Sequence, residues 1–569
     1  MDRKTWLTFL AVIGVMLIAA GFRFYDITNY PPGLFPDQAA NGEDVRLILD
    51  GDVRPFYPRG NGREALFFFI QAAFVKTFGI GVWPMFAASA AVGTATVLAT
   101  FFATRVYFGR LAGLVAALLL ATNHWHVTLS RTGFRAILIP LCLALVTAFV
   151  GYCMTATAKK QWWQAYVCAA LAGAAFASGF YTYIAYRIMI AVVLGMIVIM
   201  LVAALHPKIG FPHLRRYRWQ AALAVATGLI VIAPLALFFW QHPADFIGRA
   251  GQVSVFNPDL QRQYGGGRLL PTIAYSLRET LQSFFTGDGD RNWRHNVAGY
   301  PLLNPLVGIL FLLGLAWCIN GTVRLAYTIF KGQELHRSLI YPYLLLLLGG
   351  MIVPVITTVE GIPHGLRSIG LVFPIFFLAG TAASVCIYWI KRRYIGRTRA
   401  LLYGSVIGLL AVGMLYDGAL YFGIARHDSE AYAAYRGDLT RVAAFIEAHH
   451  QAEPTALRPL LVLDGFSMQT IHYLTSVAAH DHVVGAAVHP DEAAHHWIAV
   501  EPGVASATFA QDGQLIIFTQ STIGEADAYA RAHRNIELVT QAYNQWGQEI
   551  MRVYRGTASE PDKIDGLDA

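Results

Sequence analysis

Long apolar runs constrain the fold of this chain more than any other feature. Helices of roughly 17 to 25 apolar residues can cross a bilayer, and the sequence contains about eleven such runs: 5–22, 84–104, 111–129, 136–158, 162–179, 184–205, 219–240, 301–323, 338–357, 368–390 and 400–421. Only 14% of the residues are charged, whereas soluble domains carry about a quarter. We therefore expect a polytopic α-helical membrane protein. The shorter run 65–78 is interpreted as a juxtamembrane or re-entrant helix.

Basic connectors between these runs predict the topology. Lys and Arg concentrate at 105–110, 158–161, 206–218, 324–337 and 391–399, and a cytoplasmic N-terminus places all of these connectors inside. Counting 65–78 as a full span would move them outside. The net charge of +8 is thus a topology signal and does not indicate a nucleic-acid partner. The external segments then include loops 23–83 and 241–300 and the region after about residue 424.

Apart from Asp2, every acidic residue among the first 244 residues lies in the first external loop. The stretch "FPDQAANGEDVRLILDGD" (35–52) carries five of them, and between Glu64 and Asp245 there is no acid at all. Asp50 and Asp52 flank Gly51 and are typical of a solvated turn. Asp37 instead follows a stiff, Pro-rich exit from the first span, and Glu64 precedes the 65–78 helix. Both are expected at the bilayer surface.

Other external loops supply cations and imidazoles that can meet these acids. Glu360, His364 and Arg367 lie in the loop 357–370, and Asp290, Arg294 and His295 lie in the loop 284–305. Further connectors end in Arg131, Arg135 and Arg187, for which an interfacial anchor is the alternative interpretation. Ion-coupled transporters usually keep ionisable groups near the midplane, and these spans are nearly free of them. This distribution favours an interfacial enzyme over a transporter.

Ordered sequence stretches carry a family resemblance over roughly residues 1 to 420. They are the acidic first loop, "REALFFF", "RVYFGRLAGLVAALLLATN" before "LSRTGFR", "GDGDRNWRHNVAGYPLLNPL" and "PHGLRSIGLVFPIFFLAG". In this order the chain resembles the bacterial protein O-mannosyltransferase and aminoarabinose transferase family, a GT-C class of glycosyltransferases. The resemblance implies a multi-pass protein of the bacterial inner membrane. It would transfer a sugar from a polyprenyl phosphate to an acceptor hydroxyl or phosphate on the extracytoplasmic face, with inversion.

The resemblance also implies roles for individual residues. Asp37 matches the general base and Glu64 a second acid that orients the acceptor, although Gln38 stands where the family pattern has Glu. Donor-phosphate contacts are expected from Arg367 first, and then from His364, Arg131 and Arg294. Supporting residues are Glu43, Asp44, Glu360, His295 and Tyr183. Glu43 and Asp44 are alternatives for the base.

Sugar transfer itself requires a base and phosphate-binding cations, whatever family the chain resembles. A base on the acceptor side typically contributes on the order of 10²–10⁴-fold, and cations must face the charge that grows on the leaving phosphate. Tyr183, with Tyr181 and Tyr186, is interpreted first as an aromatic belt, with a sugar-stacking platform as the alternative.

Metal binding is not required by the sequence. The five cysteines all fall inside apolar runs, which argues against a disulfide framework and a cysteine metal site. His124 and His126 point to divergent helix faces and do not suggest a metal pair. A divalent cation beside Asp37 is compatible with the acids there, but no cofactor is needed.

The C-terminal region, 424–569, has a different composition. Polar, Ala-rich helical stretches alternate with short apolar runs such as "PLLVLDGF", "QLIIFTQ", "NIELVTQAY" and "EIMRVYR", which is typical of a soluble α/β domain. The predicted division is therefore a GT-C-like transmembrane domain over 1–423 and an extracytoplasmic α/β domain over 424–569. Two other functions remain open at this point: a lipid-linked glycan transporter or flippase, and a noncatalytic membrane scaffold.

Overall fold

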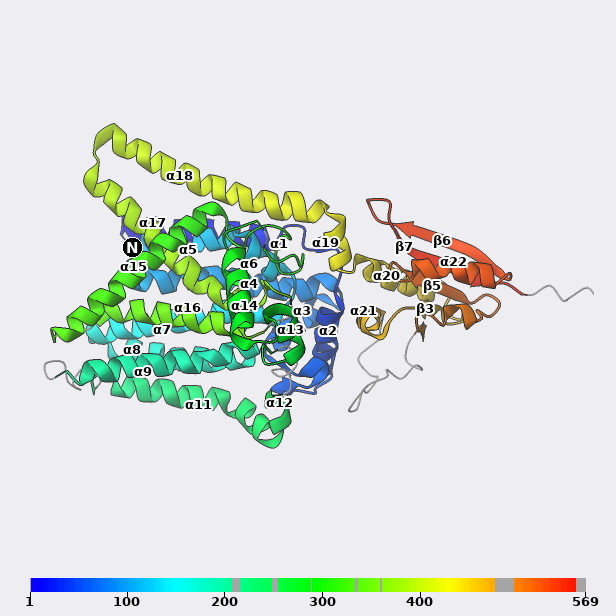
Figure 1. Cartoon of the computed structure of the whole chain (residues 1–569), viewed down its shortest axis with the longest axis horizontal. Coiled ribbons are helices and arrows are strands. Elements are labelled where there is room, and N and C mark those ends of the chain that lie inside the picture. The colour runs from blue at the N-terminus through cyan, green and yellow to red at the C-terminus, as the bar shows by residue number, and fades with distance from the viewer. Residues whose placement is uncertain are drawn as a thin grey trace, which may run out of the picture. The chain divides into compact units, whose positions relative to one another are not determined.

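The computed structural model describes residues 2–206, 215–247, 254–287, 289–332, 336–358, 361–475 and 496–558, and it is mostly helical (Figure 1). The chain forms two compact units. The membrane unit comprises Met1–Ile27, Arg54–Gln71 and Phe86–His427, and the second unit, here called the C-terminal unit, comprises Thr28–Val53, Ala72–Met85 and Asp428–Ala569.

The membrane unit is built from long helices. Among the described residues these are α1 (Arg3–Phe24), α3 (Leu66–Phe78), α4 (Val82–Phe108), α5 (Arg110–Thr122), α6 (His124–Arg131), α7 (Leu138–Ala158), α8 (Trp162–Ser178), α9 (Met189–Ala204), α11 (Arg218–Gln241), α12 (Pro243–Ile247), α13 (Pro258–Gly265), α14 (Leu269–Ser283), α15 (Pro305–Phe330), α16 (Ile340–Ile356), α17 (Val372–Arg393) and α18 (Gly396–Gly418). Short helical turns join them, of which η2 (Arg135–Ile137), η3 (Gly179–Tyr181), η4 (Ile184–Ile188) and η6 (Arg367–Leu371) concern the site. The external strands β1 (Phe56–Tyr57) and β2 (Arg63–Glu64) pair antiparallel.

Eight helices of the described residues are long and apolar enough to span a membrane, or nine if the bent pair α5 and α6 counts as one span. The other two predicted spans coincide with α8 and α16, which have 17 residues each. The fold is therefore the predicted polytopic helical one, while the number of eleven spans stays a prediction. The predicted juxtamembrane run forms α3, a short apolar helix of 13 residues.

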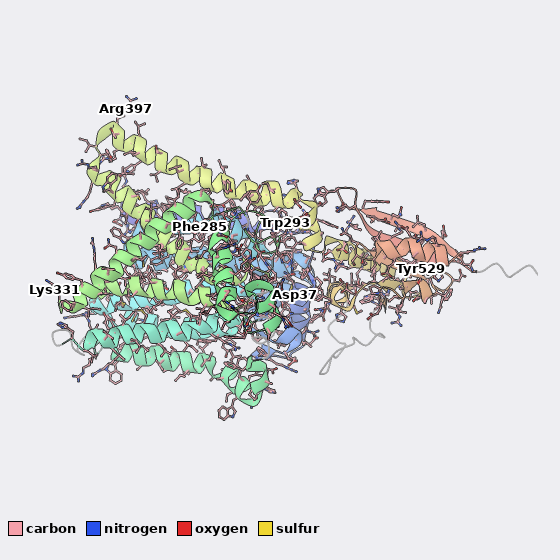
Figure 2. The ribbon with its side chains drawn as sticks, viewed as in Figure 1. Asp37, Phe285, Trp293, Lys331, Arg397 and Tyr529 are labelled. Carbon is pink, nitrogen blue, oxygen red and sulfur yellow. The ribbon has the colours of Figure 1, made fainter. Side chains whose placement is uncertain are left out.

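The ends of the membrane unit differ in charge. Lys331, at the end of α15, and Arg397, at the start of α18, lie at the end of the bundle where the N-terminus is marked in Figure 1 (Figure 2). Trp293, from the loop before α15, lies toward the opposite end of the same helices in Figure 2. Lys331 and Arg397, from two of the basic connectors, thus lie at the opposite end of the bundle from Trp293 of a predicted external loop (Figure 2).

Small residues allow the helices to approach one another closely. A Cβ atom on Gly173 of α8 would lie 1.9 Å from the carbonyl oxygen of Ala224 in α11. A Cβ on Gly380 of α17 would lie 2.5 Å from Ala116 of α5. Close backbone contact at small residues is the usual way in which membrane helices pack, because lipid offers no hydrophobic drive between them.

The span 111–129 is broken at Asn123, where α5 and α6 meet at an angle of 61°. A break releases backbone carbonyls that cannot be left unpaired in an apolar environment. Arg23 of α1 meets this need: Nη1 donates to Ala121 O at 2.7 Å and Nη2 to Leu120 O at 3.2 Å. Its other N–H groups bond to Ala19 O, Ser130 Oγ and His126 Nδ1.

Arg131 completes the join from the other side. It is fully buried, and its Nη1 donates to the carbonyls of Phe22, Arg23 and Tyr25 at 3.3, 2.9 and 2.9 Å, at the C-terminal end of α1. Its guanidinium also lies over the ring of Tyr421, 5.4 Å from the centroid. The two arginines thus join α1 to the broken helix by mutual capping.

The C-terminal unit contains a mixed sheet of five strands in the order β4-β3-β5-β7-β6. Its strands are β3 (Leu460–Val462), β4 (Ile498–Val500), β5 (Leu515–Thr519), β6 (Ile536–Tyr543) and β7 (Glu549–Gly556), and its helices are α2 (Pro36–Leu49), α19 (Ser429–Ala434), α20 (Gly437–Ala452), α21 (Gly465–Thr475) and α22 (Ile523–Ala532). β3 is parallel to β4 and β5, and β7 is antiparallel to β5 and β6. The four apolar runs predicted as strands are β3, β5, β6 and β7.

Alternation along the strands separates two cores. Leu461 and Ile517 face α20 and α21, whereas Val462 and Phe518 face α22. This is the two-residue period expected of strands covered on both faces. The α/β class predicted for this region is confirmed.

The first loop is grouped differently from the sequence prediction. The predicted boundary assigned residues 28–53 to the transmembrane domain, but these residues form a compact unit with the C-terminal region. The physical reason is that α2 packs on α21 through side-chain contacts whose partners are more than 400 residues apart in the chain.

Arg23→Gln is expected to lower the free energy of unfolding by about 3 kcal/mol, because it leaves buried carbonyls of α5 without donors. Thermal unfolding in detergent measures the change. Arg3→Gln, in the exposed first turn of the same helix, is the matched control and should unfold like the wild type. Equal stability of the two variants would contradict the capping role of Arg23.

Candidate functional site

Helix α6 is the platform on which two external loops of the membrane unit are assembled. All of its residues are buried. Trp125 Nε1 donates to Gly365 O at 3.1 Å, which holds the loop before η6. The preceding residue, Asn123, donates from Nδ2 to Leu302 O at 3.2 Å and caps α6 by accepting from His126 N.

Asp290 connects the same two loops directly. Its Oδ2 accepts from His295 Nδ1 at 2.9 Å and from Gly365 N at 2.6 Å, and its Oδ1 accepts from Asn292 N at 2.8 Å. The carboxylate is only 5% exposed, so these bonds act in a poorly solvated environment. Because His295 donates from Nδ1, its Nε2 is the nitrogen left to face a substrate.

His364, predicted to contact the donor phosphate, and His295, predicted as a supporting residue, meet at this point. The rings of His295 and His364 stack with centroids 4.5 Å apart and an interplanar angle of 20°. Arg367 begins η6 three residues after His364 and is 8% exposed, while Arg294 directly precedes His295. The structure therefore brings together the loops that carry His295, His364, Arg294 and Arg367, while their contact with a donor phosphate stays a prediction.

Glu64 lies in a second buried charge group. Its Oε2 accepts from Arg135 Nε at 3.2 Å, and its Oε1 lies 3.9 Å from Arg187 Nη2. The guanidinium of Arg135 lies over the ring of Tyr183, 5.3 Å from its centroid. Tyr183 thus has a cation on one face, a contact that neither an aromatic belt nor a sugar platform predicts.

The two groups are neighbours in the membrane unit. The turn η6, which carries Arg367, packs against both η2 and η4, which carry Arg135 and Arg187. One end of the membrane unit therefore concentrates guanidinium and imidazole groups from four separate segments.

An apolar groove of about 870 Å³ runs between α7, α8, α9 and α11. Its lining is almost entirely aliphatic and aromatic, from Val146 of α7 to Phe246 of α12, and Arg187 is the charged residue in it. Arg187 is held there by a bond from Nη1 to Phe246 O at 2.8 Å and by the Phe246 ring, 4.2 Å from its guanidinium carbon. The apolar groove thus reaches the end of the membrane unit where the cationic residues gather.

A buried His–Asp pair was missed by the sequence reasoning. His124 Nδ1 lies 2.5 Å from Asp417 Oδ1, His124 Nε2 lies 2.9 Å from Pro301 O, and Asn304 Nδ2 donates to Asp417 Oδ2 at 2.6 Å. These contacts tie α6 to α15 and α18. The sequence feature that could have indicated this pair is Asp417, a single acidic residue inside an apolar span.

The acids of the first loop lie on α2 in the C-terminal unit. Asp37 is exposed in the first turn, behind Pro36 at the first helical position, where the helix dipole favours a carboxylate. Asp44 is 1% exposed, and Glu43 pairs with His472 at 2.8 Å. Gln38 is also buried.

Three residues singled out in the sequence are not placed as expected or are not described. Arg131 is committed to the carbonyls at the end of α1, which favours a structural role over phosphate contact. Glu360 lies outside the described residues. Arg135 was weighed only as an anchor or external cation, but it pairs with Glu64 inside the protein.

Asp290, His295 and His364 form the group within the described residues whose side chains are placed to hold a metal ion, with ligand atoms within 4.8 Å of one another. Asp37, beside which a divalent cation was predicted, is not one of its members. Asp290, His295 and His364 are therefore the candidate ligands, and each offers one ligand atom.

Comparison with solved structures shows the GT-C glycosyltransferase fold. ArnT from Cupriavidus metallidurans bound to undecaprenyl phosphate has a TM-score of 0.50 and 12% identity, with 97% of this chain and 98% of that chain covered. The archaeal oligosaccharyltransferase AglB from Archaeoglobus fulgidus, in complex with an inhibitory peptide and a dolichol-phosphate, has a TM-score of 0.49 and 12% identity, with 99% and 76% covered. No protein-family profile and no curated protein sequence matches the chain. The predicted fold class is confirmed.

Asp290→Asn is expected to loosen both loops, because an amide offers one oxygen where the carboxylate accepts three N–H bonds. Hydrogen exchange should become faster in residues 289–304 and 361–367. Asp50→Asn, an exposed acid at the end of α2, is the control. Unchanged exchange in both loops would show that Asp290 does not hold them together.

Proposed function

We propose that this protein is an inverting glycosyltransferase that moves a sugar from a polyprenyl phosphate to an acceptor hydroxyl or phosphate. The observation that carries this proposal is the apolar groove that ends at Arg187, beside the turn that bears Arg367. An apolar path next to a cluster of guanidinium and imidazole groups matches a lipid chain joined to a phosphate. The ArnT structure, which shares the fold, is bound to undecaprenyl phosphate.

The leaving group explains the cations. As the bond between the anomeric carbon and the phosphate oxygen breaks, negative charge grows on the phosphate, and buried donors stabilise it more than water-exposed ones do. Arg367 offers a planar fork of donors, and His364 and His295 offer imidazole nitrogens beside it. Arg294 is the further candidate from the neighbouring loop. When an ion is bound by Asp290, His295 and His364, it would add positive charge to this same region.

The acceptor side needs a base that substrate can reach. In this proposal the acceptor oxygen attacks the anomeric carbon while its proton passes to Asp37, and the phosphate leaves with the bonding electrons. Asp37 is the exposed acid of α2, whereas Glu43 is paired with His472 and Asp44 is buried. Its exposure therefore favours Asp37 over the two alternatives.

Glu64 has a supporting role in this scheme. Its contacts balance the buried cation of Arg135 and the half-buried cation of Arg187 beside the groove. Without the carboxylate, two guanidiniums would face each other in a poorly solvated place, which is unfavourable. An acceptor-orienting role for Glu64 stays a prediction.

The location follows from the same chemistry and from the distribution of charge. We place the protein in the bacterial inner membrane with its N-terminus in the cytoplasm, because this topology puts the basic connectors on the cytoplasmic side. The site then faces the extracytoplasmic side, where the acceptor would be a protein, lipid or glycan. A flippase or a scaffold needs no base, so replacing Asp37 separates these alternatives from an enzyme.

Asp37→Asn is expected to lower kcat by on the order of 10²–10⁴-fold with little change in KM for the donor, because an amide takes no proton from the acceptor. Transfer is measured with a panel of polyprenyl-phosphate sugars in detergent or liposomes. Asp50→Asn, on the same helix, should retain activity. Full activity of Asp37→Asn would reject this base, and no transfer by the wild type with any donor would reject the class.

Arg367→Gln is expected to lower kcat/KM by about 10- to 100-fold, since a charged hydrogen bond to phosphate contributes about 1.5–3 kcal/mol. The affinity for a polyprenyl phosphate without sugar should fall in parallel. Arg278→Gln, whose side chain is 67% exposed and bonded to its neighbour Glu279, serves as control. Wild-type affinity in Arg367→Gln would remove this arginine from the donor site.

A further inference from the structure

The helix that carries Asp37 is fastened to the C-terminal α/β fold. Glu43 Oε1 lies 2.8 Å from His472 Nδ1, and Arg46 Nη2 donates to Tyr473 O at 2.6 Å. Both partners occupy consecutive positions in the last turn of α21, so these contacts join α2 to the C-terminal end of α21. The side chains of Glu43 and His472 are only 9% and 16% exposed, which makes the pair stronger than one on an open surface.

Close packing between Gly42 and Tyr473 also holds α2 against α21. Gly42 of α2 faces the ring of Tyr473, and a Cβ atom there would lie 2.5 Å from the ring carbons. Burial raises the pKa of the Tyr473 hydroxyl, and the Glu43 carboxylate adds to this effect, so the ring stays neutral. A bulkier residue at position 42 would push α2 away from α21.

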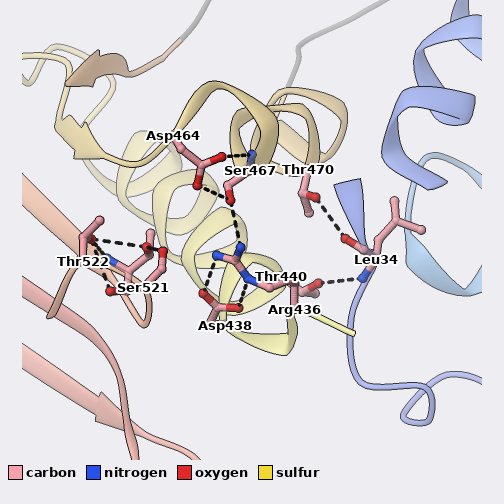
Figure 3. A network of polar contacts seen from close by, with 10 residues as sticks. Leu34, Arg436, Asp438, Thr440, Asp464, Ser467, Thr470, Ser521 and Thr522 are labelled. Atoms are coloured by element: carbon pink, nitrogen blue, oxygen red, sulfur yellow. Dashed lines mark hydrogen bonds and ion pairs between the residues drawn. The ribbon is translucent and has the colours of Figure 1, made fainter. Parts of the chain in front are cut away.

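The segment entering α2 is held as well. Leu34 O accepts from Thr470 Oγ1 at 3.0 Å, and Leu34 N donates to Thr440 Oγ1 at 3.4 Å (Figure 3). A Cβ atom on Gly33 would lie 2.7 Å from the carbonyl oxygens of Tyr435 and Arg436. These contacts lie three and four residues before Asp37.

The surface that receives α2 is itself rigid. Arg436 donates to both carboxylate oxygens of Asp438 at 3.0 Å and to Ser467 Oγ at 2.8 Å (Figure 3). Ser467 in turn donates through N and Oγ to Asp464, which caps α21. Asp438 is fully buried, so this network fixes α21 against α20 and the sheet.

We propose that His472, with Tyr473 and Thr470, is a positioning residue for Asp37, so that the C-terminal α/β domain is a working part of the catalytic apparatus. The inference rests on the proposed function, in which Asp37 is the base. In this inference, the C-terminal domain determines the position of the Asp37 carboxylate. A shift of about 1 Å in a reacting group can lower a rate by about 10²-fold, so a clamp on α2 acts on kcat.

The test compares three variants of the full-length protein. His472→Leu removes the partner of the buried Glu43 carboxylate, and His472→Asn keeps a donor near the position of Nδ1. Gly42→Ala displaces α2 through the Tyr473 ring without changing the side chain of Glu43 or His472, which gives a second, sterically based perturbation. Each variant is measured for kcat, for KM of the donor, and for hydrogen exchange of residues 36–49.

We expect His472→Leu and Gly42→Ala to lower kcat by about 10- to 100-fold with donor KM unchanged and faster exchange in α2. His472→Asn should restore most of kcat. The matched control is His449→Leu, a half-buried histidine of α20 that stacks on Phe445 of its own helix, and it should leave kcat and α2 exchange unchanged.

Two results would overturn the inference. One is wild-type kcat in His472→Leu together with faster α2 exchange, which would show that the clamp holds the helix but not the reaction. The other is a loss of kcat with unchanged α2 exchange, since positioning would then not be the cause. Failure of the proposed function is distinct, because it shows as full activity of Asp37→Asn or as no transfer by the wild type.

Discussion

The join between α1 and the broken helix supports every other feature of the site. The side chain of Arg23 makes five hydrogen bonds, two of them to carbonyl oxygens of α5 just before the break at Asn123. In turn, Arg131 at the end of α6 caps the C-terminal end of α1 by donating to the carbonyl of Arg23. Because both arginines are fully buried, their hydrogen bonds cannot be exchanged for water. The bend they stabilise turns α6 so that Asn123, His124 and Trp125 reach the two loops that carry the donor-phosphate candidates.

Three of the charge pairings described in the membrane unit are largely buried. Glu64 is set against Arg135 and Arg187, Asp417 against His124, and Asp290 against His295. The groove beside them is almost purely apolar. Such separation of a charged end from an apolar path is what an amphipathic lipid phosphate requires, and it supports the proposed donor class.

The sequence was most informative where a pattern is local. Apolar length predicted the helices, two-residue alternation predicted β3, β5, β6 and β7, and the common side of the loops predicted that His295 and His364 would meet. It missed Arg23, which follows one apolar run, and Asp417, which lies inside another, because their partners come from distant helices. It also interpreted Arg131 as a ligand for phosphate, since a guanidinium in an external connector gives no sign of the carbonyls it caps.

The sequence by itself determined the class of fold: a helical membrane protein with basic connectors on one side, ionisable loops on the other and an α/β region at the C-terminus. These properties depend on hydropathy and charge, which each segment carries on its own. Only the tertiary structure decided that α2 belongs with α21, that Glu64 is paired with two arginines, and that Trp125 holds Gly365. Those contacts join residues tens to hundreds of positions apart, and their existence depends on how helices pack rather than on any local pattern.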